Sequence, residues 1–517
     1  MSESGIEMAM SRKEREEKEK ADYEARITDP VAGSIGDLGP WQIWICIVIF
    51  MMKFPVGWHQ LATVFLAPPV SFECAVPNNL TDKCSEECTE LAYDRSVFKE
   101  TIVTEWNLVC GKRYLASFVQ TLFMFGILVG NIIFGIWSDR VGRRPPLVFS
   151  VLMQLVCGVL DAFVPWFWVF CTFRFLLGVA TGGSMMTSFV LVMEITGTKK
   201  REIMSILYQI PFNLGHMTLP VFAYFLRDWR WYQFAMSIIS VIFISYYWLI
   251  PESPRWLMSA GHLDKATKVL EKAAITNNLP IHNIRSDLEE WSRRKTIKKE
   301  VKKGTFLDLF RYPNLRVKTI CITVNWFVCG LTYFGVSQYV GELSGDIFTN
   351  VAIAGTLGIP GTLISVLTGK YWGRKISLMV SNTLAGCSML AIAFLPESSA
   401  FLKVALASIG VFGMAVSFPI VYLYGGEMFP TVVRNAGMGF ASMLARIGSM
   451  SAPFVSQTAT IAHWIPPVIF GVVPLIGAVL VMFLPETKGA PLPETIEDGE
   501  NFGKTKKSKS ESEISKN

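Results

Sequence analysis

Long apolar runs recur along almost the whole chain, and each is close to the length that crosses a lipid bilayer. An α-helix needs about 20 mostly apolar residues to span the hydrocarbon core. The segments that meet this requirement are 41–66, 114–137, 146–163, 166–193, 203–225, 231–250, 319–339, 348–367, 376–395, 401–425, 436–459 and 466–484. The sequence therefore predicts an all-α integral membrane protein with twelve transmembrane helices.

The distribution of basic residues predicts the orientation of these helices. Of the 517 residues, 51% are hydrophobic and only 17% are charged, which excludes an ordinary soluble domain. Lys and Arg collect in the connections after the second, fourth, sixth, eighth and tenth spans, and connections of this kind stay in the cytosol. Both termini are then expected to be cytosolic. The same bias accounts for the formal net charge of +6, which gives no reason to expect a nucleic-acid partner.

Polar segments flank and divide the apolar runs. Residues 1–40 and 486–517 are rich in charges or in Lys and Ser, so we predict disordered cytosolic tails, and the long polar start argues against a cleavable signal peptide. Residues 251–318 are expected to be a cytosolic central linker, with an amphipathic stretch, DKATKVLEKAA, and a basic run, RRKTIKKEVKK. The basic run either attracts lipid headgroups or is a solvated helix face.

The connection over residues 68–113 has the composition of a large extracellular loop. Its four cysteines are Cys74, Cys84, Cys88 and Cys110, and Asn79 begins an N-glycosylation acceptor. An even set of cysteines in an oxidising compartment predicts disulfide bonds, although four free thiols are the alternative. Four cysteines allow three pairings, and the sequence does not choose among them.

Three landmarks appear twice at nearly the same separation. The paired positions are Glu194 and Glu427, Gly135 and Gly369, and the triplets Pro251-Glu252-Ser253 and Pro485-Glu486-Thr487. Their separations are 233, 234 and 234 residues. We therefore predict two six-helix halves, residues 41–250 and 319–485. Parallel repeats of this kind are typical of carriers in which two bundles rock about a central substrate site.

Short motifs along the chain resemble those of a known family. The motifs are GIWSDRVGRR at 135–144, RFLLG at 174–178, EWNLVC at 105–110, DWRW at 228–231, PESPRWL at 251–257 and PTVVRN at 430–435. The first two resemble signatures of the major facilitator superfamily, and the others resemble the organic cation, carnitine and organic anion transporter family. The resemblance covers about Trp41 to Glu486 and implies a multi-pass solute carrier of the plasma membrane that works by alternating access.

The resemblance sets the expected function. It implies a facilitative or secondary-active carrier of small organic ions, with carnitine-like zwitterions or organic cations expected first and organic anions as the alternative. A non-transporting sensor on a carrier scaffold is the second alternative. The chain lacks a P-loop, an HExxH motif and a plausible metal cluster, so we expect no enzyme, cofactor or metal. The expected partners are the organic ion and the lipid bilayer, and a coupling role for Na⁺ or H⁺ stays open.

A group of charges lies where the cytosolic ends of the two halves are expected to meet. Opposite charges at that level are predicted to act as a latch that breaks when the inside opens, and the alternative is a simple topology signal. The latch residues are Asp139, Arg140, Arg143, Arg144, Glu194, Arg201, Glu427 and Arg434. The second-half segment Gly369-Lys-Tyr-Trp-Gly-Arg374-Lys375 lacks the Asp, which weakens the case for a second latch.

Three basic residues lie deep inside predicted spans, where charge is costly and usually functional. Arg174 belongs to the fourth-helix motif and is predicted to have a structural role, with a role in transport as the alternative. Lys53 and Arg446 are predicted to bind substrate, and the alternative for Lys53 is snorkelling or pairing across helices. The segment around Arg446 resembles the form found in carnitine and anion carriers, and Met185 departs from the aromatic residue common in cation carriers. Further substrate-binding candidates, chosen by position in family-like motifs, are Tyr208, Gln209, Trp326, Tyr333, Phe334 and Tyr422. The alternative for these is ordinary helix packing.

Overall fold

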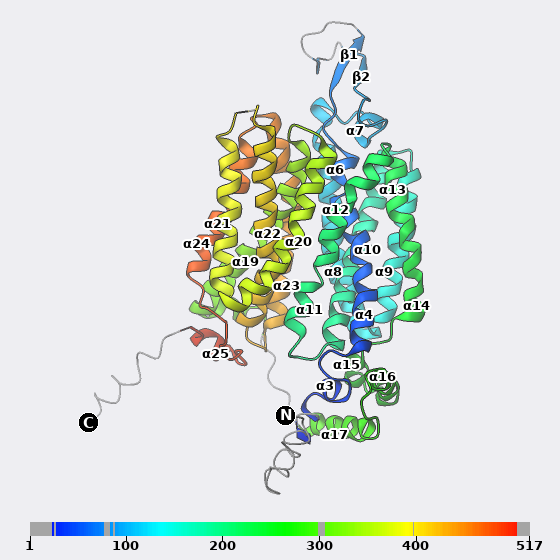
Figure 1. Cartoon of the computed structure of the whole chain (residues 1–517), viewed down its shortest axis with the longest axis vertical. Helices are drawn as coiled ribbons and strands as arrows, with labels where there is room; N and C mark the ends of the chain where they lie inside the picture. The colour runs from blue at the N-terminus through cyan, green and yellow to red at the C-terminus, as the bar shows by residue number, and fades with distance from the viewer. Residues whose placement is uncertain are drawn as a thin grey trace, which may run out of the picture.

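Two bundles of helices stand side by side in the computed structural model, which describes residues 23–24, 27–76, 83–85, 88–297, 305–396 and 398–503 (Figure 1). In the first bundle the long helices are α8 (Tyr114–Val141), α9 (Arg144–Phe163) and α10 (Phe167–Ile195). In the second they are α19 (Pro313–Tyr339), α20 (Ile347–Tyr371), α21 (Arg374–Ala393), α22 (Ala400–Met428), α23 (Arg434–Gln457) and α24 (Ile465–Met482).

The other three spans of the first bundle are interrupted. The first span consists of α4 (Pro40–Met51), α5 (Lys53–Leu61) and α6 (Thr63–Leu66). The fifth consists of α11 (Arg201–Leu207) and α12 (Ile210–Phe225), and the sixth of α13 (Trp229–Ile238), a 3₁₀ segment (Ile239–Ser245) and α14 (Tyr246–Leu249). Pro211 lies at the start of α12, where its missing N–H is tolerated. The expected unbroken spans are therefore divided where proline or a 3₁₀ turn interrupts the α-helical hydrogen bonds.

Within the described residues, ten helical stretches are long and apolar enough to cross a membrane. The fifth span is outside this set because α12 is only 16 residues long, and α23 carries the eleventh predicted span. Together with these two, the helices account for the twelve predicted spans. The prediction of an all-helical membrane protein with two six-helix halves is confirmed by the structure and by the comparisons reported below.

The internal repeat is visible in a matching turn in each half. Gly142 has φ of +112° and precedes α9, and Gly373 has φ of +89° and precedes α21. A Cβ at Gly142 would lie 2.4 Å from a carboxylate oxygen of Glu252, and a Cβ at Gly373 would lie 2.5 Å from one of Glu486. Only glycine satisfies both the left-handed backbone and the close carboxylate. Each carboxylate accepts hydrogen bonds from the backbone at the start of the next helix.

The loop that was predicted to be extracellular forms a small separate lobe at one end of the first bundle (Figure 1). Strands β1 (Phe72–Val76) and β2 (Glu90–Tyr93) pair antiparallel, and α7 (Ile102–Glu105) follows. Disulfide bonds join Cys74 to Cys88 and Cys84 to Cys110, which confirms the predicted disulfides and selects one of the three pairings. Asn79 lies outside the described residues, so its glycosylation stays a prediction.

These bonds lead to a first testable prediction. The four loop cysteines should resist alkylation in the intact protein and react after reduction, because a disulfide sulfur is not a nucleophilic thiolate. Replacing Cys84 by Ser should reduce the amount of folded protein at the cell surface, since losing a native disulfide in a small extracellular unit costs about 2–5 kcal/mol. Cys387, which is exposed and free, provides the matched Ser variant as a control. Labelling of all four thiols without reductant would contradict the prediction.

The described parts of the segments that were expected to be disordered tails contain helices. Over residues 1–40 the prediction is wrong at least for α3 (Pro30–Ile35), which buries Val31 and Ile35 against the linker helices. These linker helices are α15 (Pro254–Ser259), α16 (Leu263–Thr276) and α17 (Ile284–Ile297), and α18 (Asp308–Arg311) precedes α19. The side chain of Asn277, which follows α16, bonds to the N–H of Trp41 at 2.9 Å and to the carbonyl of Ile35 at 2.8 Å. Composition alone does not show such tertiary partners.

The start of the second tail, expected to be disordered over 486–517, is also folded within the described residues. Helix α25 (Ile496–Asn501) lies against the start of α19. The carboxylate of Glu500 accepts hydrogen bonds from the backbone N–H groups of Asn314 and Leu315, at 3.2 and 2.9 Å. Lys318 donates to the carbonyl of Gly499 at 2.9 Å. An acidic residue of the tail thus caps the free N–H groups of a transmembrane helix.

Candidate functional site: a basic cavity between the halves

Side chains from both halves enclose a cavity in the middle of the membrane domain. Its lining from the first half is Lys53, Gln60, Met185, Gln209, Phe212 and Asn213, and from the second half Tyr333, Phe334, Thr362, Ala415, Phe418, Pro419, Tyr422 and Arg446. The cavity has a volume of about 50 Å³. A drug-sized ligand occupies a pocket of about 300 Å³ or more. The halves must therefore move apart before an organic ion fits.

Lys53 and Arg446, the two basic residues that were predicted to bind substrate, line this cavity. Lys53 is 1% exposed and Arg446 is 6% exposed, and no carboxylate belongs to the lining. Within the described part of the chain neither residue forms an ion pair, and the Nε of Arg446 has no hydrogen-bond partner. The Lys53 ammonium lies 4.1 Å from the ring centroid of Tyr208. The cavity is consequently a buried site with two basic side chains and no acid in its lining.

Aromatic side chains also line the cavity. Phe418 and Tyr422, one turn apart on α22, are stacked with centroids 5.9 Å apart, and Phe418 also contacts Tyr333 at 5.9 Å. Trp326 lies behind Tyr422 at a centroid distance of 4.0 Å and does not line the cavity. A flat aromatic or apolar group of a ligand would have ring faces to stack on.

The sequence-predicted residues fall into two groups. Lys53, Gln209, Tyr333, Phe334, Tyr422 and Arg446 line the cavity, and so does Met185. Trp326 and Tyr208 are buried one layer behind it. The sequence reasoning did not single out the lining residues Gln60, Phe212, Asn213, Thr362 and Phe418. Helical spacing from Tyr422 to Phe418, and from Gln209 to Phe212 and Asn213, would have indicated three of them.

Hydrogen bonds join the halves directly at the cavity. Asn213 donates from Nδ2 to Thr362 Oγ1 at 2.7 Å, and Tyr333 donates its hydroxyl to Asn213 Oδ1 at 3.0 Å. Because Asn213 belongs to the first half and the other two to the second, opening the cavity breaks both bonds. Breaking these two bonds costs little net free energy, because water replaces the lost partners. Such bonds suit an interface that opens during transport.

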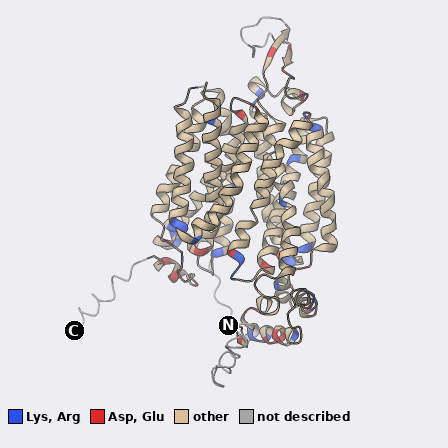
Figure 2. Ribbon diagram, viewed as in Figure 1, with Lys and Arg blue, Asp and Glu red and all other residues tan. Residues whose placement is uncertain are grey.

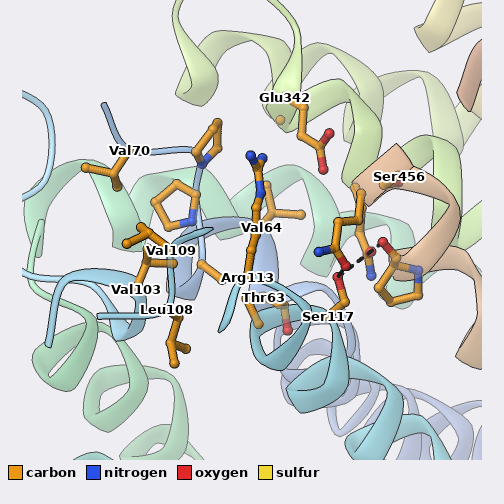
Figure 3. A pocket seen from close by; sticks show the side chains of 18 of the residues that line it. Thr63, Val64, Val70, Val103, Leu108, Val109, Arg113, Ser117, Glu342 and Ser456 are labelled. Atoms are coloured by element: carbon orange, nitrogen blue, oxygen red, sulfur yellow. Dashed lines mark hydrogen bonds between the residues drawn. The ribbon is translucent and has the colours of Figure 1, made fainter. Parts of the chain in front are cut away.

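The seam is also closed on the side of the extracellular lobe. Ser117 on α8 donates to Gln457 at 3.1 Å, and Thr121 donates to the carbonyl of Met450 at 2.8 Å. Phe65 and Phe348 stack with centroids 5.7 Å apart. Outside this contact lies a vestibule of about 240 Å³, shown in Figure 3, in which Arg113 from the first half and Glu342 from the second point into the same space.

The predicted latch residues form a network, but chiefly within the first half. Arg143 pairs with Glu194 and with Asp139, each at 2.7 Å. Burial alone would lower the pKa of Arg143, but its hydrogen bonds to these carboxylates outweigh burial and raise the pKa, so the guanidinium stays charged. Arg201 and Arg434 donate to carbonyls of their own halves, and Arg144 to that of Tyr247. Arg140 is exposed on α8.

The ion pair that joins the two halves, among the described residues, is formed by residues outside the predicted latch set. Arg374 pairs with Glu427 at 2.8 Å in the same way that Arg143 pairs with Glu194, so the second half does carry a counterpart. Arg374 also pairs with Glu202 of the first half at 3.0 Å. The expectation that the predicted residues themselves bridge the halves is therefore corrected. The repeat of Gly142-Arg143 as Gly373-Arg374 was the signal that could have indicated Arg374.

This bridge gives a second prediction. Glu202→Gln should shift the conformational balance toward the state that is open on the cytosolic side and slow turnover, since it removes a contact made in only one conformation. Glu202 is 43% exposed, so the pair is worth only about 0.2–1 kcal/mol and the shift is at most about fivefold. Transport kinetics would be compared with Glu290→Gln, whose partners Arg293 and Arg294 lie on its own helix. Identical kinetics in the wild-type protein, Glu202→Gln and Glu290→Gln would contradict the prediction.

Arg174 lies apart from the cavity. Its guanidinium is fully buried 3.9 Å from the carboxylate of Asp161, which is also fully buried. It lies over the ring of Phe123 at 4.8 Å. This placement agrees with the predicted structural role, which stays a prediction until it is tested.

A two-half helical membrane domain with a closed, buried ligand cavity defines a membrane carrier. The family described as sugar (and other) transporter matches residues 45–498, and the chain belongs to this family of the major facilitator superfamily, with the organic cation and anion transporters as its relatives. It is 36% identical to the organic cation transporter protein of Drosophila melanogaster, over 92% of this chain and 95% of that one. It is also 36% identical to organic anion transporter 3 of Homo sapiens, over 92% and 86%.

A solved structure shows the same fold. The inward-open xylose transporter XylE from E. coli superposes with a TM-score of 0.65 at 18% identity, over 89% of this chain and 99% of that one. At this identity the likeness concerns the fold alone. The relatives are transporters, so the chain is a multi-pass membrane transporter, and the predicted family and transport class are confirmed.

Proposed function

We propose that this protein moves small organic anions across the membrane by alternating access, with Arg446 and Lys53 holding the substrate carboxylate. The observation that carries the proposal is the cavity with two buried cations and no lining carboxylate. A desolvated pair of like charges is costly, and an anion between them removes that cost. The planar donor fork of Arg446 suits bidentate binding of a carboxylate.

The carnitine-like zwitterion that was expected first is the second candidate. Its support is the aromatic wall, because Tyr333, Phe418 and Tyr422 offer ring faces to a quaternary ammonium group. A simple organic cation is the least favoured substrate, since it would enter a cavity that already holds two positive charges. The charge of the cavity thus favours the organic anion over the other two classes.

The transport cycle follows from the contacts between the halves. With the external contacts closed and the Glu202–Arg374 pair broken, substrate exchanges with the side on which the linker helices lie. Breaking the Ser117 and Thr121 bonds opens the path to the vestibule while the Glu202–Arg374 pair holds the opposite end. We place the carrier in the plasma membrane with both termini cytosolic and Asn79 glycosylated outside. Its coupling to Na⁺ or H⁺ would appear as a dependence of uptake on that ion's gradient.

A competition panel tests the proposed substrate class. Cells that express the protein would take up a labelled aromatic carboxylate in the presence of unlabelled aromatic carboxylates, carnitine-like zwitterions or quaternary amines, with untransfected cells as background. We expect strong competition by carboxylates, weaker competition by zwitterions and none by quaternary amines. Competition by quaternary amines alone would contradict the anion proposal, and no saturable uptake of any probe would favour the sensor alternative.

A further inference from the structure

A groove of about 710 Å³ lies where the first bundle meets the linker helices, away from the central cavity. One wall comes from α9, with Arg144, Val148, Phe149 and Leu152. The floor comes from the linker, with Trp256 on α15, His262, and Lys265 on α16. Figure 1 shows α15 and α16 directly beneath this bundle, at the end that bears the chain termini.

The groove has a net positive lining. Its cationic side chains are Arg144 and Lys265, and among the described residues neither has a carboxylate within ion-pair distance. The carboxylate that does line the groove, that of Glu252, accepts hydrogen bonds from the backbone N–H groups of Arg143 at 2.7 Å and Ser253 at 2.9 Å. The negative charge of Glu252 is therefore directed at backbone N–H groups rather than at the side chains of Arg144 and Lys265.

Arg144 is held at the mouth of the groove. Its guanidinium donates to the carbonyl of Tyr247 and lies 5.1 Å from the centroid of that ring. This contact uses one of its five N–H donors and leaves the others available to an anion. Lys265 is exposed on α16 and brings a second charge to the same groove.

The wall formed by α9 belongs to a predicted membrane-spanning segment. Phe149 is 50% exposed and Tyr247 is 56% exposed, and both lie on predicted spans, where lipid acyl chains surround exposed apolar side chains. The charged ribbon segments in Figure 2 gather toward the ends of the bundles, and their middle is nearly free of charge. The groove therefore spans the boundary at which a lipid places its chains above and its headgroup below.

We propose that this groove binds one anionic phospholipid of the adjacent leaflet, with its phosphate groups on Arg144 and Lys265 and its acyl chains along Phe149 and Leu152. A zwitterionic phospholipid brings no net negative charge and binds less tightly. Because the groove joins α9 to the linker helices, the lipid connects the first bundle to its cytosolic helices.

The test uses the full-length protein in neutral detergent, titrated with phosphatidylinositol 4-phosphate or with phosphatidylcholine of the same acyl chains and followed by native mass spectrometry. We expect saturable binding of one phosphatidylinositol 4-phosphate at low concentration. Arg144→Gln and Lys265→Gln should each weaken it about fivefold, as expected for one basic residue near an anionic headgroup. Lys268→Gln, on an exposed position of the same helix outside the groove, should leave it unchanged.

A third experiment tests whether the groove recognises the whole lipid or only its phosphate group. Inorganic phosphate in molar excess should not displace the lipid, since it lacks the acyl chains that occupy the apolar wall. Three results would overturn the proposal: equal binding of phosphatidylcholine, unchanged binding in both Arg144→Gln and Lys265→Gln, or full displacement by inorganic phosphate. Lys265→Gln keeps the test independent of folding, because this side chain is exposed and makes no described ion pair.

Discussion

Replacing Arg446 by Asp is expected to abolish the uptake of carboxylate substrates. The substitution removes the donor fork and puts a negative charge beside the site of the substrate carboxylate, with Lys53 as the remaining cation. Losing one partner of a buried charge pair costs about 2–5 kcal/mol, which corresponds to a fall in affinity of about 30-fold or more. The Asp variant should also gain uptake of simple cations. Labelled substrates of both charge classes, with surface protein quantified, measure the two effects.

Arg446→Lys separates charge from geometry. It keeps the positive charge but offers a point donor, so we expect an intermediate loss of carboxylate affinity. Ser451→Ala is a suitable control on the same helix, because Ser451 is half-buried outside the cavity lining and bonds only to the carbonyl of Ile447 among the described residues. Carboxylate uptake with unchanged affinity in both Arg446 variants would show that the substrate carboxylate binds elsewhere.

Arg174→Gln is expected to destabilise the first half strongly. Asp161 is fully buried, and removing its cation leaves a carboxylate without compensation in the bundle core. Breaking a buried pair from one side costs about 3–5 kcal/mol. The double variant Asp161→Asn with Arg174→Gln should recover much of this loss, because it leaves no net charge. Thermal unfolding of the purified proteins in detergent would measure both.

An exposed ion pair provides the control. Arg294 is 40% exposed and pairs with Glu290 and Glu24, so Arg294→Gln should lower the thermal midpoint far less than Arg174→Gln. A thermal midpoint for Arg174→Gln equal to that of Arg294→Gln would refute the structural role of Arg174. A double variant that is less stable than Arg174→Gln alone would show that Asp161 has a different partner.

The folded ends of the chain show where sequence reasoning stopped. Residues 30–35 and 496–501 lie in polar surroundings that predict disorder, yet both form helices on the membrane domain. Their stability comes from partners far along the chain, such as Asn277 for the first and the start of α19 for the second. Local composition carries no information about such contacts.

The cavity was partly predictable for a different reason. Lys53 and Arg446 stood out because an ionisable residue in an apolar run is rarely present without a role. Phe212, Asn213 and Thr362 did not stand out, since aromatic and small polar residues are common in helices that merely pack. Trp326 and Tyr208 were predicted to bind substrate, but they lie one layer behind the cavity lining. The rotation of a helix about its axis is set by its neighbours, and the sequence of one helix does not show it.

The sequence alone determined the membrane class, the number of spans, the two-half plan and the carrier family, because each rests on features repeated along the chain: apolar length, basic connections and duplicated motifs. The tertiary structure decided the disulfide pairing, the Glu202–Arg374 bridge and the meeting of Lys53 with Arg446 in one cavity without an acid. These depend on distances between residues far apart in the chain, which the packing of the two bundles sets and which no local pattern encodes.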